Sequence, residues 1–98
     1  MLRRPYAVYI LTNPRHTTLY IGVTRDLVRR LHQHRSGTGS AFVRRYHLDQ
    51  LVYVEFHDEA RFAIEREKQL KAGSRARKVA LIERANPEWR DLSRPYSG

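Results

Sequence analysis

Cysteine is absent from this chain of 98 residues. Its absence excludes a disulfide framework, a cysteine-based zinc site and a cysteine nucleophile. A chain without cysteine suits a reducing compartment, and we expect a cytoplasmic protein. Methionine and tryptophan each occur once, whereas tyrosine occurs six times and phenylalanine three times. Apolar residues make up 41% of the chain, which predicts a folded globule and argues against a disordered protein.

Long hydrophobic runs are also missing. The basic start of the chain, from Met1 to Arg4, resembles the first part of a signal peptide, but the apolar stretch after it stops at Thr12. That stretch is too short for a signal-peptide core or a membrane span, so we expect no membrane partner. The length predicts a single domain over residues 1–98, with a folded core over residues 6–92 and a loose tail over residues 93–98.

Acidic residues are scarce, because 10 aspartates and glutamates face 19 lysines and arginines, for a formal net charge of +9. Residues 24–45 carry six arginines against Asp26 alone. An uneven basic field of this kind is typical of nucleic-acid-binding proteins, although solubility alone is the simpler interpretation of the charge. We expect the following side chains to contact nucleic acid: Arg25, Arg29, Arg35, Arg44, Arg45 and Lys71.

Three segments have the composition of β-strands. Residues 6–11 and 18–24 are rich in β-branched and aromatic side chains, and Asn13-Pro14 between them is a turn signal. The short connection predicts an antiparallel hairpin. Residues 51–56 predict a third strand. Gly22, inside the second strand, leaves room for another group to approach the backbone.

Apolar periodicity and capping signals predict three helices, over residues 26–35, 59–72 and 75–85. Leu27, Val28 and Leu31 form the expected buried stripe of the first helix. Residues 37–40 are rich in glycine and predict a flexible loop. The order β-β-α-β-α-α indicates an α/β domain in which three helices flank a three-stranded, mainly antiparallel sheet.

Glu67 stands where the second helix is expected to present an apolar residue. The other members of this inward stripe are Ala60, Ala63, Ile64 and Leu70. A carboxylate that faces a protein core is costly unless a cation or a metal ion pairs with it. A salt bridge to an arginine explains Glu67 without any function. The functional alternative is an oxygen ligand for one divalent cation, Mg²⁺ or Mn²⁺.

Four other side chains are ordinary when each is taken singly. Tyrosines such as Tyr9 and Tyr20 pack well in strands, while a single helix arginine or histidine is most often solvated. Arg30 and His34 are i,i+4 neighbours at the border of the first helix's apolar stripe. Two phenols, a cation, an imidazole and the acid Glu67 in one basic domain together indicate phosphodiester chemistry.

The same residues resemble the motifs of the GIY-YIG nuclease superfamily, and most closely its small stand-alone bacterial branch. Ala7-Val8-Tyr9 stands at the first element of the family motif, and Tyr20-Ile21-Gly22 reproduces the second. Further matches are Thr24 to His34 in the family's first helix, Arg66 to Lys71 in its second, and Asn86 to Leu92 in the closing segment. The resemblance spans residues 6–92 and implies the GIY-YIG fold.

The resemblance also implies a set of active-site residues: Tyr9, Tyr20, Arg30, His34 and Glu67. It implies that Glu67 is the single protein ligand of one divalent metal ion, Mg²⁺ or Mn²⁺. It places Arg30 on the scissile phosphate and either Tyr9 or Tyr20 beside the attacking water. A free phenol has a pKa of about 10, so the tyrosine that acts as a base needs a neighbour such as His34 to take its proton.

Three positions depart from the pattern of the family. Ala7 replaces the first motif glycine, and Val23 stands where some relatives carry a lysine. Val79 occupies the place of an asparagine that some relatives have beyond the second helix, and Asn86 is a candidate substitute. These departures keep two alternatives open, a nucleic-acid-binding module without catalysis and a small protein-interaction domain whose charge serves solubility.

Together the residues and the resemblance predict a metal-dependent endonuclease that hydrolyses phosphodiester bonds. DNA is the expected partner, in duplex, branched or single-stranded form, with RNA as the alternative. The resemblance implies a role in DNA repair or recombination. No base-reading motif is visible, so we expect weak sequence preference or targeting by a protein partner. The sequence leaves the oligomeric state open, and also which tyrosine is the base.

Overall fold

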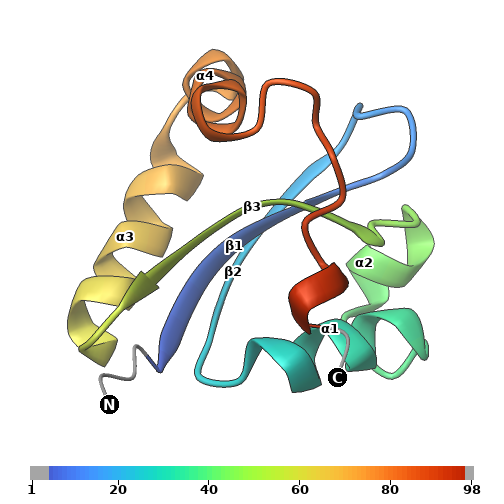
Figure 1. Cartoon of the computed structure of the whole chain (residues 1–98), viewed down its shortest axis with the longest axis horizontal. Coiled ribbons are helices and arrows are strands. Elements are labelled where there is room, and N and C mark those ends of the chain that lie inside the picture. Colours follow the sequence, from blue (N-terminus) through green and yellow to red (C-terminus); the bar gives the residue numbers. More distant parts are fainter. Residues whose placement is uncertain (1–4, 97–98) are drawn as a thin grey trace.

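A three-stranded antiparallel sheet forms the centre of the computed structural model, which describes residues 5–96 (Figure 1). The strands are β1 (Tyr6–Thr12), β2 (Leu19–Thr24) and β3 (Gln50–His57), in the order β2-β1-β3. The central strand, β1, pairs antiparallel with both neighbours. The predicted hairpin and the third strand are therefore confirmed, and β2 and β3 are the two edges of the sheet.

The helical segments are α1 (Leu27–Arg35), α2 (Ala41–Arg45), α3 (Ala60–Ala72), α4 (Arg75–Ala85) and the short 3₁₀ helix η1 (Arg94–Tyr96). The three predicted helices are confirmed as α1, α3 and α4. The other two, α2 and η1, are additional, because segments this short show no apolar periodicity in a sequence. Within residues 5–96, none of the helices combines the length and the apolarity needed to cross a membrane.

Polar side chains cap the first and the last of the longer helices. The Asp26 carboxylate accepts a hydrogen bond of 3.1 Å from the backbone N–H of Arg29 and so begins α1. The Ser74 hydroxyl accepts one of 3.2 Å from the backbone N–H of Arg77 and begins α4. Each cap satisfies one of the backbone donors that a helix start leaves unpaired, which sets where the helix begins.

The register of the hairpin puts the two motif tyrosines on one face of the sheet. Leu11 lies opposite Tyr20, and Tyr9 lies opposite Gly22. Residues paired in this way point to the same face, and so do alternate residues of one strand. Tyr9, Leu11 and Tyr20 therefore share the face that α1 covers.

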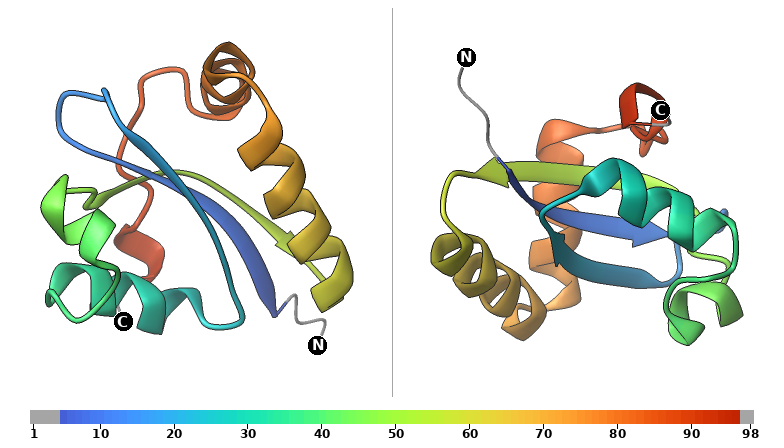
Figure 2. Two further views of the ribbon diagram at one scale, coloured as in Figure 1. Left: turned by 180° about the vertical axis from the view of Figure 1, so that it is seen from behind. Right: turned by 90° about the horizontal axis from the view of Figure 1, so that it is seen from below.

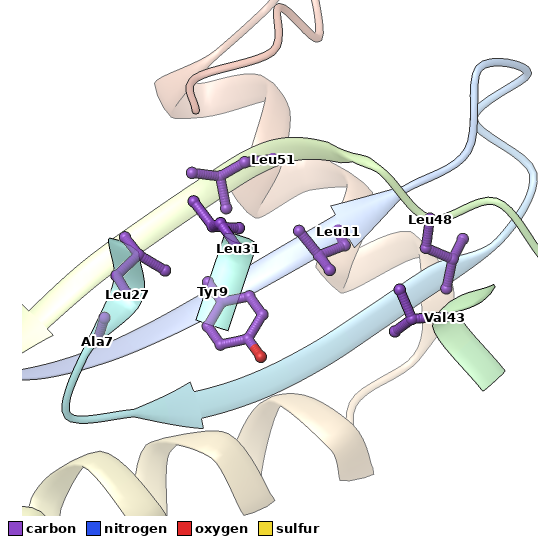
Figure 3. Close-up of a cluster of buried hydrophobic side chains, with 8 residues drawn as sticks. All are labelled: Ala7, Tyr9, Leu11, Leu27, Leu31, Val43, Leu48 and Leu51. Carbon is purple, nitrogen blue, oxygen red and sulfur yellow. The ribbon is translucent and has the colours of Figure 1, made fainter. Parts of the chain in front are cut away.

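Two hydrophobic clusters cover the two faces of the sheet. The first consists of Ala7, Tyr9, Leu11, Leu27, Leu31, Val43, Leu48 and Leu51 (Figure 3). The second consists of Val8, Ile10, Ile21, Val52, Tyr53, Ala63, Leu70 and Ile82. Figures 1 and 2 show the sheet between α1, α2 and η1 on one side and α3 and α4 on the other. Because successive side chains of a strand point to opposite faces of the sheet, the strands contribute residues to two separate cores.

Two residues predicted to be buried lie at the surface instead. Val28 is 42% exposed and Ile64 is 43% exposed. In α1 the face toward the sheet is carried by Leu27, Leu31 and His34, and Val28 lies one step around the helix. Ile64 is displaced from the buried face of α3 in the same way, because that helix covers the sheet with a narrow stripe.

The closing segment of the chain is tied to β3. The Asn86 side-chain amide donates to the backbone oxygens of Val52 and Arg90, at 3.1 and 2.8 Å. The Asp91 carboxylate accepts from the backbone N–H of Leu51 at 3.1 Å. Tyr96 packs against the first cluster, so the expected loose tail is packed as far as this residue, and residues 97–98 lie outside the described range. Asn86 thus ties the end of α4 to β3 and to the closing segment.

Candidate active site

Tyr9 lies at the centre of the site, on the central strand. Its side chain is fully buried, and Figure 3 shows its hydroxyl oxygen directed toward β2. A Cβ atom at Gly22, the residue opposite, would lie only 2.5 Å from that oxygen. The phenol therefore crosses β2 at the one position that has no side chain. The group that was expected to approach the backbone of Gly22 is the Tyr9 ring.

The Tyr9 hydroxyl has two side-chain partners, both on α1. Arg30 Nη1 donates to it at 3.4 Å, and His34 Nε2 lies 3.3 Å from it. A guanidinium can only donate hydrogen bonds, so the phenol oxygen accepts from Arg30 and its own proton is available to His34 Nε2. Both distances are long for hydrogen bonds, which is common where a ligand completes the geometry.

The pKa of Tyr9 is raised to about 12. Burial is the largest cause. The positive charge and the hydrogen bond of Arg30 lower this pKa, while Tyr20 and the negative charge of Glu67 raise it. Tyr9 is therefore a neutral phenol near neutral pH. The negative charge of Glu67, on α3, is the smallest of these causes.

His34 is buried at the far end of the same hydrogen bond. Burial, and then the charge of Arg30, lower the pKa of His34, so the imidazole is neutral near pH 7. Its Nδ1 atom is buried and has no hydrogen-bond partner within residues 5–96. A Cβ atom at Gly39 would lie 2.8 Å from that nitrogen, so the glycine makes room for the ring. A neutral imidazole beside Tyr9 is suited to accept a proton.

Tyr20 forms the outer wall of the site. Its ring centroid lies 6.4 Å from that of Tyr9, 6.0 Å from that of His34 and 6.3 Å from that of Phe42 on α2. Tyr20 is half-buried, whereas Tyr9 is fully buried. Tyr20 is therefore the phenol that solvent and a substrate can reach. The sequence analysis missed Phe42 because it predicted no helix over residues 41–45.

Glu67 projects from α3 with 16% of its side chain exposed. Its partner is Lys71 Nζ at 3.4 Å, one helical turn further on, and not an arginine. No group of three or more histidine, aspartate or glutamate side chains within residues 5–96 could hold a metal ion. A single carboxylate such as Glu67 suits an ion such as Mg²⁺, because that ion keeps several waters and binds one or two carboxylates together with substrate phosphates.

We call Tyr9, Tyr20, Arg30, His34 and Glu67 the Tyr9 cluster. The structure brings the first four together through the distances above, and Glu67 joins them through its electrostatic effect on Tyr9. The five residues come from β1, β2, α1 and α3. The cluster combines a fixed cation, a neutral base, a reachable phenol and a carboxylate. Such a set can bind a phosphate and assist attack by water.

The basic residues expected to contact nucleic acid are all exposed: Arg25, Arg29, Arg35, Arg44, Arg45 and Lys71. Five of them also have partners within the protein, since Lys71 pairs with Glu67 and the guanidinium groups of Arg25 and Arg45 lie over the rings of Tyr6 and Tyr46. Arg35 donates to the Ser93 hydroxyl and lies 3.7 Å from Asp91, which ties α1 to the closing segment. Arg44 donates to the Gly37 carbonyl at 2.7 Å. Whether these side chains bind nucleic acid stays a prediction.

A second cluster of similar residue types, which the sequence did not reveal, lies at the β3 edge. This Tyr53 cluster consists of Tyr53, Glu55, His57 and Arg66. Glu55 accepts from the Tyr53 hydroxyl at 2.5 Å and from Arg66 Nε at 3.0 Å, and it lies 2.6 Å from His57 Nε2. Burial alone would raise the pKa of Glu55, but these three hydrogen bonds outweigh it and hold that pKa below its usual value.

Known protein sequences are similar to this chain. Residues 5–80 match the family model described as the GIY-YIG catalytic domain. A UPF0213 protein of Haloquadratum walsbyi is 35% identical over 78 residues, which cover 80% of this chain and 83% of the relative. A UPF0213 protein of Syntrophus aciditrophicus is 39% identical over 72 residues, covering 72% and 82%. The names of these relatives describe no activity, so they establish kinship alone.

A solved structure shows the same fold. The solution NMR structure of the UPF0213 protein BH0048 from Bacillus halodurans aligns with a TM-score of 0.58 and 27% sequence identity. The alignment covers 90% of this chain and 93% of the other. The similarity in fold therefore extends over nearly the whole of both chains.

Proposed function

Because this chain belongs to the GIY-YIG catalytic domain family, a nuclease family, we propose that it is a metal-dependent endonuclease. The expected substrate is DNA. One observation carries the proposal: the Tyr9 hydroxyl is held between Arg30 and a neutral His34, within electrostatic range of Glu67. A buried phenol and imidazole beside a partly buried guanidinium, with long hydrogen bonds and an unpaired buried nitrogen within the described residues, need an explanation beyond core packing.

The exposure of the side chains indicates a different role for each tyrosine. Hydrolysis requires a water molecule to attack the phosphorus while the bond to the leaving oxygen breaks. Tyr20 is the reachable phenol, so we assign it to contact with the attacking water or the phosphate. Tyr9 is buried and positions Arg30 and His34. Arg30 offsets the negative charge that grows on the phosphate oxygens, an effect commonly worth about 3 kcal/mol.

Glu67 would hold the divalent ion, Mg²⁺ or Mn²⁺, together with water and substrate oxygens. A bound ion supplies Lewis-acid stabilisation of charge on the phosphate oxygens. Lys71, now 3.4 Å from Glu67, is free to turn outward because its side chain is 56% exposed. Manganese binding can be measured without any cleavage, by the loss of the free Mn²⁺ signal in electron paramagnetic resonance, and Glu67→Gln is expected to abolish it.

Cleavage of end-labelled single-stranded, duplex and branched DNA tests the proposed function. The reactions contain Mg²⁺, Mn²⁺ or EDTA. We expect metal-dependent cutting that is lost in Glu67→Ala and retained in Glu65→Ala, an exposed glutamate on the same helix. Tyr20→Phe is expected to slow cutting more than Tyr9→Phe. Cutting that survives in both tyrosine variants, with folding verified, would refute the assigned roles.

A second candidate function is nucleic-acid binding without catalysis. The observation in its favour is that the single carboxylate of the site already pairs with Lys71. This function predicts salt-sensitive binding through the exposed arginines and no metal-dependent cutting. The same cleavage experiment decides between the two, because binding without cutting, unchanged in Glu67→Ala, contradicts the nuclease. A role in DNA repair or recombination belongs to the proposal as an expectation from the family.

A further inference from the structure

A continuous run of aromatic rings leads outward from the candidate active site. The ring centroids of Tyr9 and Tyr20 are 6.4 Å apart, those of Tyr20 and Phe42 are 6.3 Å apart, and those of Phe42 and Tyr46 are 4.7 Å apart. The two outer rings are more exposed than the two inner ones. Tyr9 is fully buried, Tyr20 is half-buried, Phe42 is 45% exposed and Tyr46 is 42% exposed.

The outer two rings are not needed for the protein core. Phe42 and Tyr46 are i,i+4 neighbours at α2, and the inward residue of this helix is Val43, which is 2% exposed. Phe42 and Tyr46 therefore lie on the outer face of α2. Large exposed aromatic side chains that adjoin one another indicate a binding surface more often than a structural requirement.

The charge around the rings is positive. Arg44 and Arg45 lie between Phe42 and Tyr46 in the sequence, and the Arg45 guanidinium stands 5.7 Å from the Tyr46 ring centroid. Residues 41–46 carry no acidic side chain. Aromatic rings beside arginines match the chemistry of nucleotides, since each nucleotide has an apolar base face and a phosphate. An apolar or acidic protein partner fits this combination less well.

We propose that Tyr20, Phe42 and Tyr46 form a stacking platform for the unpaired bases of single-stranded nucleic acid next to the scissile phosphate. The inference rests on the proposed nuclease function, because that function places a phosphodiester at Tyr20. The rings can stack only on base faces that are exposed. In a duplex these faces are covered by neighbouring base pairs, so the platform selects single strands or unpaired segments.

Binding of a fluorescent oligothymidylate tests the platform, with a duplex of the same length measured in parallel. Both titrations are made in EDTA, so that no cleavage occurs. Phe42→Leu and Tyr46→Leu keep apolar bulk but remove the ring. We expect each to weaken single-strand binding by about fivefold to a hundredfold, and duplex binding by less than about twofold. A fluorescent purine analogue placed in the oligonucleotide is expected to lose its stacking signal in the same variants.

Phe62→Leu is the matched control. Phe62 is also an exposed phenylalanine on a helix, and Arg61 lies over its ring at 4.8 Å, but it belongs neither to the aromatic run nor to the Tyr9 cluster. This variant is expected to bind both nucleic acids as the unaltered protein does. Equal weakening of single-strand and duplex binding by Phe42→Leu, or no weakening, overturns the platform.

Two further outcomes separate this inference from others. If Phe42→Leu changes the sedimentation behaviour of the protein and leaves single-strand affinity unchanged, the surface is a protein contact and the platform is wrong. Selective loss of single-strand binding in a protein that never cuts supports the platform and contradicts the nuclease. The binding and cleavage experiments therefore fail independently of each other.

Discussion

The Tyr9 cluster, on β1 and β2, and the Tyr53 cluster, on β3, use nearly the same residue types on one small sheet. Each contains a buried tyrosine whose pKa is raised to about 12, together with a glutamate, a histidine and an arginine. They even share a helix, because Arg66 and Glu67 are consecutive in α3 and serve different clusters. Composition alone therefore does not distinguish a site from a structural network.

The two clusters differ in how completely their polar atoms are paired. In the Tyr53 cluster, Glu55 accepts short hydrogen bonds from three partners. In the Tyr9 cluster, the hydrogen bonds are 3.3 and 3.4 Å long, and a buried nitrogen of His34 is unpaired within the described residues. A fully paired network is typical of a structural role, whereas incomplete pairing is consistent with the ligand site proposed for the Tyr9 cluster.

The largest expected effect distinguishes the two glutamates by activity. Glu67→Gln removes the negative charge from the proposed metal ligand, so we expect the cleavage rate to fall by about a thousandfold or more. Thermal unfolding should change little, because the pair with Lys71 is largely exposed on the lysine side. A Glu67→Gln protein that cuts DNA at the original rate would break the functional half of the comparison.

The second prediction concerns the crossing of β2 by Tyr9. Gly22→Ala places a methyl group 2.5 Å from the Tyr9 hydroxyl oxygen, so the ring must move. We expect a loss of about 3 kcal/mol in the free energy of unfolding, measured by urea denaturation, and slower cleavage. Gly73→Ala is the control, since the nearest atom to a Cβ there is 3.5 Å away and its φ is −72°. Equal stability of the two variants would contradict the packing argument.

The third prediction concerns Glu55, for which we expect the opposite of Glu67: a loss of stability and little change in cleavage. Glu55→Gln weakens three hydrogen bonds and leaves Arg66 without its carboxylate partner. We expect a loss of about 2 kcal/mol in the free energy of unfolding and a cleavage rate within about twofold of the original. Chemical denaturation and a single-turnover cleavage assay measure the two quantities. Strong loss of cleavage in a folded Glu55→Gln protein would show that the Tyr53 cluster also serves function.

The smallest expected effect is a difference in pH dependence. The pKa of His34 is lowered from 6.5, so the unfolded chain takes up a proton there before the folded protein does. Stability is therefore lost as pH falls below 6.5. The pKa of Glu55 is also lowered, so stability is lost in the same direction at lower pH, as pH falls below 4.5.

Denaturant titrations at several pH values measure the loss of stability below pH 6.5 and the further loss below pH 4.5. NMR titration of the His34 ring tests whether the first loss belongs to His34. Glu55→Gln is expected to remove the Glu55 contribution to the loss of stability below pH 4.5 and to leave the loss below pH 6.5 unchanged. If the His34 resonance titrates above pH 6.5, burial does not hold the imidazole neutral, and the neutral base assigned to the Tyr9 cluster is wrong.

Much of the fold could be predicted from local signals. Strand composition, a proline turn and the caps Asp26 and Ser74 located the three strands and the three longer helices. These signals act between residues close in sequence, so a single chain displays them. The short α2 and η1 could not be predicted, because their conformation depends on packing against the first cluster and not on their own periodicity.

The site was predictable as a set of residues but not as an arrangement. The motif residues Tyr9, Tyr20, Arg30, His34 and Glu67 could be named because their types and spacing resemble a family. The exposed positions of Val28 and Ile64 could not be foreseen, since the width of a buried stripe depends on what packs against the helix. The same holds for Asn86, whose amide is occupied by backbone oxygens of β3 and the closing segment.

The sequence by itself determined the strands, the longer helices, the basic charge and the identity of the motif residues, because these depend on neighbouring residues and on composition. The tertiary structure decided which tyrosine is buried, which glutamate is saturated, and that Phe42 continues the aromatic run from Tyr20. Burial and hydrogen-bond pairing are set by residues far apart in the chain, so they emerge only when β1, β2, α1 and α3 pack together.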